Sequence, residues 1–308
     1  MNLKSLAGFL SEGASLNSCI YRVPSGDGEH FVVAKAARTP GTAMLKALRK
    51  EYSALEELNL RVGNALGVSV PRPLGFVEEQ GILLLSGVAG FSLGSTLRRQ
   101  ANFLNGRLHH QSLQQIGLLV GDWLHHFHDA TLAEDQPHHH NDYLRELDSN
   151  LYRSRQSGLS ASALQKIRDG VEATSATLRG TNVPMAAAHG DFLPQNILIG
   201  ETGAGVVDFG SYWQQAPIYR DLSHLSAYLT LLANRPAYDR GALEALKRGF
   251  LTGYCRTLKG DLLRIWEVNA TLRIINDRSS VLTARRSRKI ERALLALSEV
   301  ATATSRDL

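Results

Sequence analysis

The sequence predicts a two-lobed α+β protein in which a small, strand-rich front lobe precedes a larger, mainly helical back lobe. The chain has 308 residues, which is too long for one small core. Up to about residue 88, short apolar runs alternate with turn residues, whereas most of the remainder has helical periodicity. One further pair of apolar runs interrupts the helical part at residues 186–209. We therefore expect lobes at residues 1–88 and 89–308.

The front lobe is expected to contain two hairpins and one helix. Turn-rich sequences divide the apolar runs of residues 19–35 and of residues 74–85, as in β-hairpins. A helix is predicted between them, with Thr42 as a candidate N-cap, because apolar residues recur at helical spacing at Met44, Leu48, Leu55 and Leu58. The Gly-Val-Ala-Gly sequence at residues 87–90 is expected to act as a hinge.

The back lobe shows several amphipathic helices. One apolar stripe comprises Ile116, Val120, Trp123 and Phe127, and another comprises Leu222, Leu225, Leu229 and Leu232. Helical patterns continue at residues 243–250, 262–275 and 290–300. Two short apolar runs, at residues 196–199 and 205–208, instead predict a hairpin with a Gly-rich turn.

The composition excludes several classes of protein. Hydrophobic residues make up 44% and charged residues 20%, which argues against global disorder. No apolar run approaches the roughly 18 residues of a membrane span. We expect no signal peptide, because residues 1–5 contain no basic segment that leads into a long apolar stretch. The two cysteines, Cys19 and Cys255, are expected to be free thiols. We therefore expect a cytoplasmic protein.

The informative motif lies at residues 189–196, His-Gly-Asp-Phe-Leu-Pro-Gln-Asn, and is followed by Asp-Phe-Gly at 208–210. Phosphoryl transfer needs cations on the phosphates, a group that holds the acceptor hydroxyl, and in-line geometry. Asp191, at the start of a tight loop, could accept the proton of that hydroxyl. Asn196 and Asp208 could share a magnesium ion, which prefers hard oxygen ligands.

The spacing of these residues supports this interpretation. Asn196 follows Asp191 by five residues, and Asp208 follows Asn196 by twelve, which suits a hairpin that returns Asp208 beside Asn196. Alternatively, His189, Asp191 and Asn196 could be loop residues that make Asx-type turns. The hairpin that ends in Asp-Phe-Gly favours the catalytic interpretation.

The front lobe supplies a second signal. Lys35 follows the apolar run Phe-Val-Val-Ala, where its ammonium group needs a phosphate or a carboxylate. Glu51 lies sixteen residues further on, on the apolar stripe of the predicted helix, so its carboxylate should face inward. A Lys–Glu pair of this kind positions a strand lysine against nucleotide phosphates. The alternative is that Lys35 and Glu51 are two unrelated surface charges. The order of the lysine, the glutamate and the motif at residues 189–196 along the chain disfavours this alternative.

The whole chain resembles the family of aminoglycoside phosphotransferases and choline kinases, which have a protein-kinase-like fold. The resemblance implies that ATP and Mg²⁺ are cofactors, that Asp191 is the catalytic base in the motif opened by His189, and that Asn196 and Asp208 bind the metal. It also implies that Lys35 contacts the α- and β-phosphates with Glu51 as its partner. The phosphate-covering loop would fall at residues 13–18, with Gly13 and Ser15. Asp221 matches a family position that is expected to be a structural brace and N-cap.

Two departures from protein kinases favour a small-molecule acceptor. Gly190 stands where their catalytic loop has an arginine that senses a phosphorylated activation segment. Arg220 follows Gly210 by only ten positions, and no Ala-Pro-Glu follows, so a long activation segment has no room. We therefore expect transfer of the γ-phosphoryl group from ATP to a hydroxyl of a small molecule.

The net charge of +5 bears on the acceptor. Residues 273–292 contain seven basic and two acidic residues. The local net charge of +5 equals the net charge of the whole chain. This basic segment is either a solvated helix face or a site for an anionic acceptor or an anionic membrane or glycolipid surface. It disfavours polycationic aminoglycosides, so a sugar, a sugar phosphate or an envelope glycolipid is preferred. We expect no nucleic-acid partner.

Other classes of function stay open. The chain could phosphorylate an aminoglycoside or another antibiotic, or be a nucleotide-binding module without catalysis; the presence of Asp191, Asn196 and Asp208 opposes the second. Choline would need an aromatic cage, for which the candidates are Tyr212, Trp213, Tyr219 and Tyr228. The histidines at 125, 126 and 128 are interpreted as packing or capping residues, and those at 138–140 are not expected to complete a metal site. The sequence favours no oligomeric state.

Overall fold

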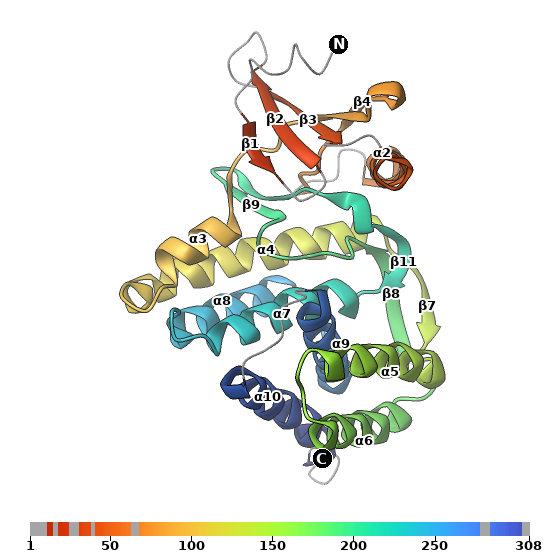
Figure 1. Cartoon of the computed structure of the whole chain (residues 1–308), viewed down its shortest axis with the longest axis vertical. Helices are drawn as coiled ribbons and strands as arrows, with labels where there is room; N and C mark the ends of the chain where they lie inside the picture. The colour runs from red at the N-terminus through yellow and green to blue at the C-terminus, as the bar shows by residue number, and fades with distance from the viewer. Residues whose placement is uncertain are drawn as a thin grey trace. The chain divides into compact units, whose positions relative to one another are not determined.

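The computed structural model describes residues 11–14, 18–24, 31–37, 41–62, 68–277 and 284–303. The chain forms two compact units (Figure 1). The first unit comprises residues 1–93 and 189–213, and the second comprises residues 94–188 and 214–308. The segment that carries the predicted catalytic motif therefore belongs with the strand-rich unit. The lobe boundary expected at residues 88 and 89 stays a prediction.

The first unit contains a five-stranded antiparallel sheet with the order β1-β2-β3-β5-β4 (Figure 1). Its strands are β1 (Ser11–Ala14), β2 (Ser18–Pro24), β3 (Phe31–Ala37), β4 (Pro73–Val77) and β5 (Ile82–Ser86), with the 3₁₀ turn η1 (Glu78–Gln80) before β5. Both predicted hairpins are present. Ala34 and Ala36 bury one face of β3 against Ile82, so Lys35 projects from the opposite face.

The helix predicted in this unit is α2 (Thr42–Val62), which packs against β4 and β5. Its core stripe is Leu48, Leu55 and Leu58, each at most 1% exposed. Glu51 lies on the same stripe and is 2% exposed, as the sequence predicted. Thr42 is the first residue of the helix.

A second sheet in this unit has the order β10-β9-β6, from β6 (Phe91–Ser92), β9 (Ile197–Gly200) and β10 (Gly203–Val206). The predicted hairpin is therefore present, but its turn is shorter than expected because Gly203 pairs directly with Gly200. The 3₁₀ turn η3 (Phe209–Ser211) follows and packs against α2. The short turn returns Asp208 to the level of Asn196, whose carbonyl accepts from the Val207 N–H at 2.9 Å.

The second unit is mainly helical, and all five helices expected from the sequence are present. Its elements are α3 (Leu93–Gln100), η2 (Gly106–His109), α4 (His110–Ala130), β7 (Ala133–Pro137), α5 (His140–Gln156), α6 (Ala161–Thr177), β8 (Asn182–Ala188), β11 (Trp213–Pro217), α7 (Tyr219–Ala233), α8 (Arg240–Gly253), α9 (Gly260–Asp277) and α10 (Ala284–Ala303). The three strands form a small sheet of order β11-β8-β7, which the sequence did not indicate. None of the described helices is long and apolar enough to span a membrane.

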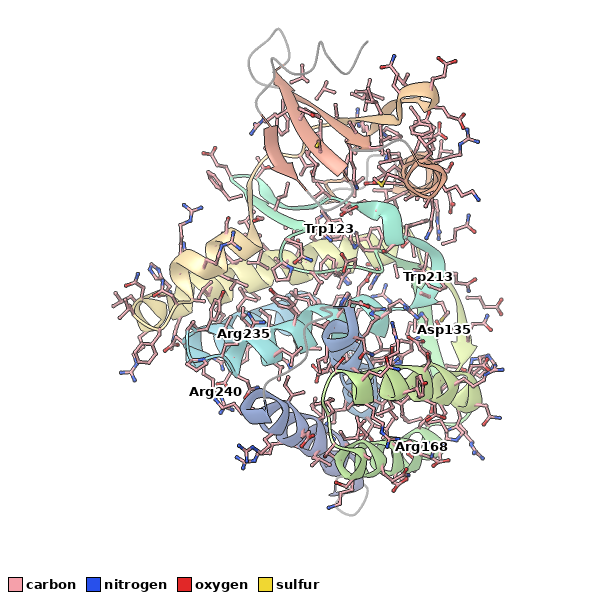
Figure 2. All side chains as sticks on the ribbon, in the orientation of Figure 1. Trp123, Asp135, Arg168, Trp213, Arg235 and Arg240 are labelled. Atoms are coloured by element: carbon pink, nitrogen blue, oxygen red, sulfur yellow. The ribbon has the colours of Figure 1, made fainter. Side chains whose placement is uncertain are left out.

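Helices α4 and α8 pack closely against each other. Each carries two glycines four residues apart, and each glycine approaches the backbone of the other helix. A Cβ atom at Gly121 would lie 2.1 Å from the Phe250 carbonyl oxygen, and one at Gly253 would lie 2.2 Å from that of Leu118. Trp123 of α4, labelled in Figure 2, is 1% exposed. Larger residues at these glycines would push the helix pair apart.

Candidate active site

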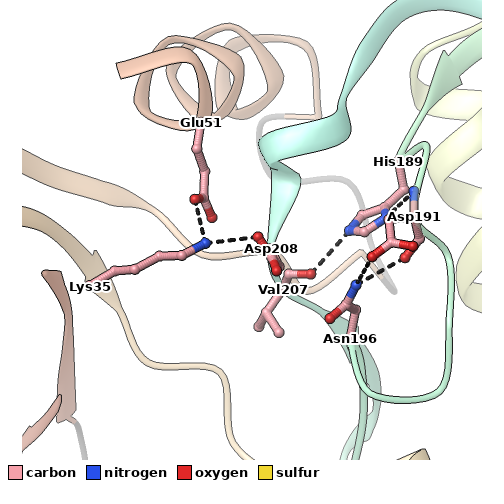
Figure 3. A network of polar contacts seen from close by, with 7 residues as sticks. All are labelled: Lys35, Glu51, His189, Asp191, Asn196, Val207 and Asp208. Carbon is pink, nitrogen blue, oxygen red and sulfur yellow. Dashed lines mark hydrogen bonds and ion pairs between the residues drawn. The ribbon is translucent and has the colours of Figure 1, made fainter. Parts of the chain in front are cut away.

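Lys35 joins two carboxylates that come from distant parts of the chain (Figure 3). Its Nζ lies 2.6 Å from Oε2 of Glu51 on α2 and 2.8 Å from Oδ1 of Asp208, which follows β10. The sequence predicted the pair with Glu51 and did not predict the pair with Asp208. An ammonium group has three donors, so a third direction remains for a phosphate oxygen.

Burial and charge act against each other in this network. Burial alone would lower the pKa of Lys35, but Glu51 and Asp208 outweigh it and raise that pKa. For Glu51 burial outweighs Lys35, so the pKa of this carboxyl is raised. Burial would also raise the pKa of Asp208, but Lys35 lowers it below its ordinary value. Asp208 is therefore ionised at neutral pH, as a metal ligand must be.

Asp191 and Asn196 lie close together in the loop before β9 (Figure 3). The Asn196 side-chain amide donates to Oδ2 of Asp191 at 2.9 Å and to its backbone oxygen at 3.0 Å. Asn196 is 6% exposed, so the contact is held in a fixed position. The amide nitrogen is used here, which leaves the amide oxygen as the atom of Asn196 that could bind a metal ion.

His189 contacts the same loop through one ring nitrogen and Val207 through the other. It is fully buried, and its Nε2 lies 3.0 Å from the carbonyl oxygen of Val207, which can only accept. The backbone N–H of Asp191 donates to Nδ1 at 3.2 Å. In these contacts Nε2 donates and Nδ1 accepts. The ring also lies edge-on to Phe209, with centroids 4.7 Å apart. His189 thus joins the loop that contains Asp191 to the Asp-Phe-Gly segment.

Gly190 is required by its surroundings. Its φ is +80°, in the left-handed region that favours glycine. A Cβ atom at this position would also lie 2.2 Å from the backbone oxygen of Ser211. The arginine of protein kinases therefore has no space here. This close approach depends on a contact twenty-one residues away, so the sequence alone gave no signal for it.

Asp208 adopts a left-handed conformation, with φ 70° and ψ 66°, which is uncommon for a residue other than glycine. The turn directs its carboxylate toward Lys35. The sequence motif predicted the residue but not this conformation, which costs free energy and persists because the surrounding contacts hold it.

A magnesium ion fits the donor set of Asn196 and Asp208. Both present hard oxygens, and the hairpin brings their backbones together. Within the described part of the chain, no cluster of three or more His, Cys, Asp or Glu side chains could hold a metal by itself. Magnesium in nucleotide sites is commonly held by one or two protein groups and by substrate phosphates, so the small donor set is adequate.

The predicted phosphate loop is only partly described, and Asp221 lies at a different helix position than expected. Gly13 and Ala14 lie at the end of β1, with Gly13 paired with Ile20, and Ser18 begins β2, whereas Ser15 and residues 16–17 of the expected phosphate loop lie outside the described residues. The expectation that Asp221 is an N-cap is wrong. α7 begins at Tyr219 with Ile218 as its N-cap, so Asp221 is inside the first turn, where it is fully buried. That position is consistent with its other expected role as a structural brace.

The aromatic candidates after the motif differ in burial. Tyr212 is 7% exposed, and its hydroxyl lies 3.4 Å from Nη1 of Arg61 on α2. Trp213 is 49% exposed, so it is not a core residue. Tyr219 is buried, and its hydroxyl accepts from the Lys259 N–H at 3.0 Å. Tyr212 and Tyr219 are thus buried and make contacts through their hydroxyls, whereas Trp213 is exposed.

The basic segment is divided between different environments. The guanidinium of Arg273 donates to Nδ1 of His224 at 2.9 Å. Lys289 and Arg292 line a groove of about 690 Å³ between α7, α8 and α10. Arg278 and the side chains of Arg285 and Arg286 lie outside the described residues.

Comparison with family models decides the class of protein. Residues 12–259 match the model of the phosphotransferase enzyme family, which is well over half of the chain. The chain belongs to this family. The match includes the Lys35–Glu51 pair and both parts of the catalytic motif, so the resemblance inferred from the sequence is confirmed. No curated protein sequence matches this phosphotransferase.

Solved structures show that the phosphotransferase has the kinase-like fold. It matches the ternary complex of APH(2'')-IIa with streptomycin and ATP at a TM-score of 0.58 and 13% identity, covering 96% of this chain and 94% of the other. A glucosamine kinase matches at 0.54 and 18% identity, covering 96% and 91%. A choline/ethanolamine kinase family protein from Mesorhizobium loti matches at 0.56 and 15% identity, covering 97% and 90%. At these identities the likeness establishes the two-lobed α+β fold and not the acceptor.

Proposed function

We propose that this phosphotransferase uses ATP and Mg²⁺ to phosphorylate a hydroxyl of a small molecule, namely a sugar, a sugar phosphate or an envelope glycolipid. The observation that carries the proposal is the network of Lys35, Glu51 and Asp208 beside the Asp191–Asn196 contact (Figure 3). It supplies a cation for phosphates, oxygens for a metal and a base for a hydroxyl, which are the components that phosphoryl transfer needs.

Asp191 is proposed as the residue that receives the acceptor hydroxyl. The Asn196 amide holds one oxygen of the Asp191 carboxylate at 2.9 Å, which fixes the orientation of the carboxylate. His189 fixes the backbone N–H of the same residue. A base that is held in this way loses little entropy when it accepts the proton of the hydroxyl.

Lys35 is proposed to contact the nucleotide phosphates, with Glu51 as its anchor. Asn196 and Asp208 are proposed to hold Mg²⁺, which would neutralise charge that develops on the phosphates. Lys35 lies against Asp208, so both groups face the same position. Gly13 and Ser15 are proposed to belong to the loop that covers the phosphates.

The charge of the helical unit supports a neutral or anionic acceptor. The groove between α7, α8 and α10 is lined by four basic side chains, Arg240, Lys247, Lys289 and Arg292, and by one acidic side chain, Glu244. A polycationic aminoglycoside would be repelled by such a surface. The fold is shared with a glucosamine kinase as well as with antibiotic kinases, so a sugar acceptor is consistent with the family.

The test is an ADP-release assay with a panel of sugars, sugar phosphates, glycolipids and aminoglycosides, with and without Mg²⁺. We expect Mg²⁺-dependent turnover with a neutral or anionic member of the panel. Asp191→Ala should lower kcat by at least a thousandfold and leave ATP affinity within about threefold, because the nucleotide is bound elsewhere. Asp142→Ala, at a 63% exposed aspartate of α5, is the matched control and should have no effect.

Two outcomes would contradict the proposal. Turnover with aminoglycosides alone would reassign the acceptor and make this chain an antibiotic kinase. Retention of more than a tenth of the wild-type kcat in Asp191→Ala would remove Asp191 as the base.

A further inference from the structure

The connection between α3 and α4 exposes three large apolar side chains within six residues. Phe103 is 70% exposed, Leu104 is 85% exposed and Leu108 is 82% exposed. We call these three residues the apolar turn. Single exposed apolar residues are common on protein surfaces, but a cluster of this kind usually marks a contact with a partner or a membrane.

The apolar turn is held in place by specific contacts. The side-chain oxygen of Asn102 accepts from the N–H of Leu104 at 3.1 Å and from that of Asn105 at 3.0 Å. The Asn102 amide donates to the carbonyl oxygen of Arg99 at 2.8 Å, which joins the turn to the end of α3. The side chain of Asn102 thus replaces backbone partners on both sides of the turn.

The turn is also fixed to the connection between α7 and α8 at the same end of the helical unit (Figure 1). The N–H of Phe103 donates to the carbonyl oxygen of Ala237 at 3.0 Å, and that of Asp239 donates to Ala101 at 2.9 Å. Gly106 lies so close that a Cβ atom there would be 2.1 Å from Cβ of Asp239. The fold therefore presents the apolar side chains to solvent in a fixed arrangement and gives them no core to enter.

The surroundings of the apolar turn are basic. No aspartate or glutamate occurs in residues 94–121, whereas Arg98, Arg99 and Arg107 are exposed in or next to the turn. Arg235 lies in the adjoining α7–α8 connection and Arg240 begins α8, and both are labelled in Figure 2. The acidic groups nearby are engaged: Asp239 bonds to His110 at 2.9 Å, and Glu244 bonds to Arg240 at 2.6 Å.

We propose that the apolar turn inserts into the interface of an anionic lipid bilayer, with the surrounding arginines on the lipid phosphates. Protruding apolar side chains and a rim of one charge sign match a surface that is apolar below and anionic above. A protein partner would more commonly meet a flat or concave surface with both charge signs in its rim. The contact is peripheral, and it lies in a different part of the chain from the basic segment at residues 273–292.

The test is co-sedimentation with vesicles in the absence of nucleotide, so the result does not depend on the proposed phosphotransferase activity. Wild type should bind vesicles of phosphatidylcholine with 30% phosphatidylglycerol at least tenfold more tightly than vesicles of phosphatidylcholine alone. The triple variant Phe103→Ser/Leu104→Ser/Leu108→Ser should weaken binding to the anionic vesicles at least tenfold. Arg98→Glu/Arg107→Glu should weaken it similarly at low salt, and the difference should shrink as salt screens the charges.

Matched controls distinguish binding through the apolar turn from non-specific hydrophobic and electrostatic binding to the vesicles. Leu60→Ser/Leu74→Ser/Leu132→Ser removes three other exposed leucines, and Arg145→Glu/Arg248→Glu reverses two other exposed arginines. Both should bind as wild type does. Equal binding by the apolar-turn variant and its control, or no binding by wild type, would overturn the proposal. Self-association of wild type in light scattering that the apolar-turn variant loses would assign the turn to a second copy of the chain, and would also overturn it.

Discussion

Lys35 shows how one residue determines the electrostatics of the site. Two carboxylates compete for its ammonium group, and each is affected differently by burial. Glu51 is 2% exposed, and its second oxygen has no hydrogen-bond partner among the described residues, whereas the Asp208 side chain is 49% exposed. Removal of Lys35 would therefore leave Glu51 as a buried charge without compensation, while water could solvate Asp208.

Lys35→Met is accordingly expected to lower the free energy of unfolding by about 3 kcal/mol at pH 7. The double variant Lys35→Met/Glu51→Gln should be more stable than the single variant, because it removes the buried charge that Lys35→Met leaves behind. Lowering the pH should also reduce the loss, since protonation neutralises Glu51. Thermal unfolding followed by circular dichroism measures these differences.

Arg49→Met is the control for loss of a basic residue. Arg49 makes an ion pair with Glu78 in which both side chains are more than half exposed, and such pairs contribute at most about 1 kcal/mol. If Lys35→Met/Glu51→Gln is no more stable than Lys35→Met, the buried charge of Glu51 does not need Lys35 for compensation, and the prediction is wrong.

At the scale of elements, the catalytic loop depends on contacts that are distant in the sequence. The spacing between Asp191, Asn196 and Asp208 predicted a hairpin that brings the last two together, because strand pairing has a regular geometry. The close contact of Gly190 with Ser211, the left-handed backbone of Asp208 and the bond from Lys35 to Asp208 depend on three-dimensional packing. No periodicity in the sequence encodes such contacts, so only their participants could be predicted.

The same reasoning applies outside the site. The apolar stripes of α4 and α7 predicted those helices because burial imposes a period of 3.6 residues. The sheet of β7, β8 and β11 gave no comparable signal. Its strands are short, and β7, Ala-Glu-Asp-Gln-Pro, is mainly polar, so it lacks the alternation that predicts a strand. The apolar stripes thus predicted most helices of the second unit. The small sheet could not be predicted, because it depends on pairing between strands that are distant in the sequence.

Gly190→Ala tests whether the loop geometry is essential. Gly180 provides a matched control: its φ is +71°, but no atom lies within 4 Å of a Cβ added there. Gly180→Ala should therefore cost only the conformational penalty of about 1 kcal/mol. Gly190→Ala has the same penalty and also a contact at 2.2 Å with the Ser211 oxygen, so it should cost at least about 2 kcal/mol more. Denaturant unfolding compares the two variants.

Activity provides a second measure of this change. Gly190 lies between His189 and Asp191, so a displaced loop should lower kcat by more than a hundredfold in Gly190→Ala, with little change in Gly180→Ala. Equal stability and equal kcat in the two variants would show that the close contact at residue 190 has no effect.

At the scale of the whole molecule, several histidines are buried inside the helical unit. His128 of α4 is fully buried, with Nδ1 2.7 Å from the hydroxyl oxygen of Tyr254, the residue after α8. His138 and His140 both contact the hydroxyl of Ser175 on α6, at 2.8 and 2.9 Å. The His128 contact joins α4 to the end of α8, and the other two join residues 138 and 140 to α6, so protonation of His128 or His138 affects the packing of two segments.

The stability of the protein should therefore fall in mild acid. Burial lowers the pKa of His128 to about 3, and it also lowers the pKa of His138. Above pH 6.5 these rings are neutral in both the folded and the unfolded chain, so they contribute no pH dependence. As the pH falls below 6.5, these histidines become protonated in the unfolded chain but stay neutral in the folded chain. Each such ring therefore lowers the free energy of unfolding by up to about 1.4 kcal/mol per pH unit.

His128→Gln should be less stable than wild type at pH 7 but should lose less stability between pH 7 and pH 5. His126→Gln, at a 42% exposed ring of the same helix, should keep the wild-type slope. Thermal unfolding at pH 5, 6 and 7 measures these slopes, and a slope in His128→Gln equal to that of wild type would show that His128 is not a source of the acid sensitivity.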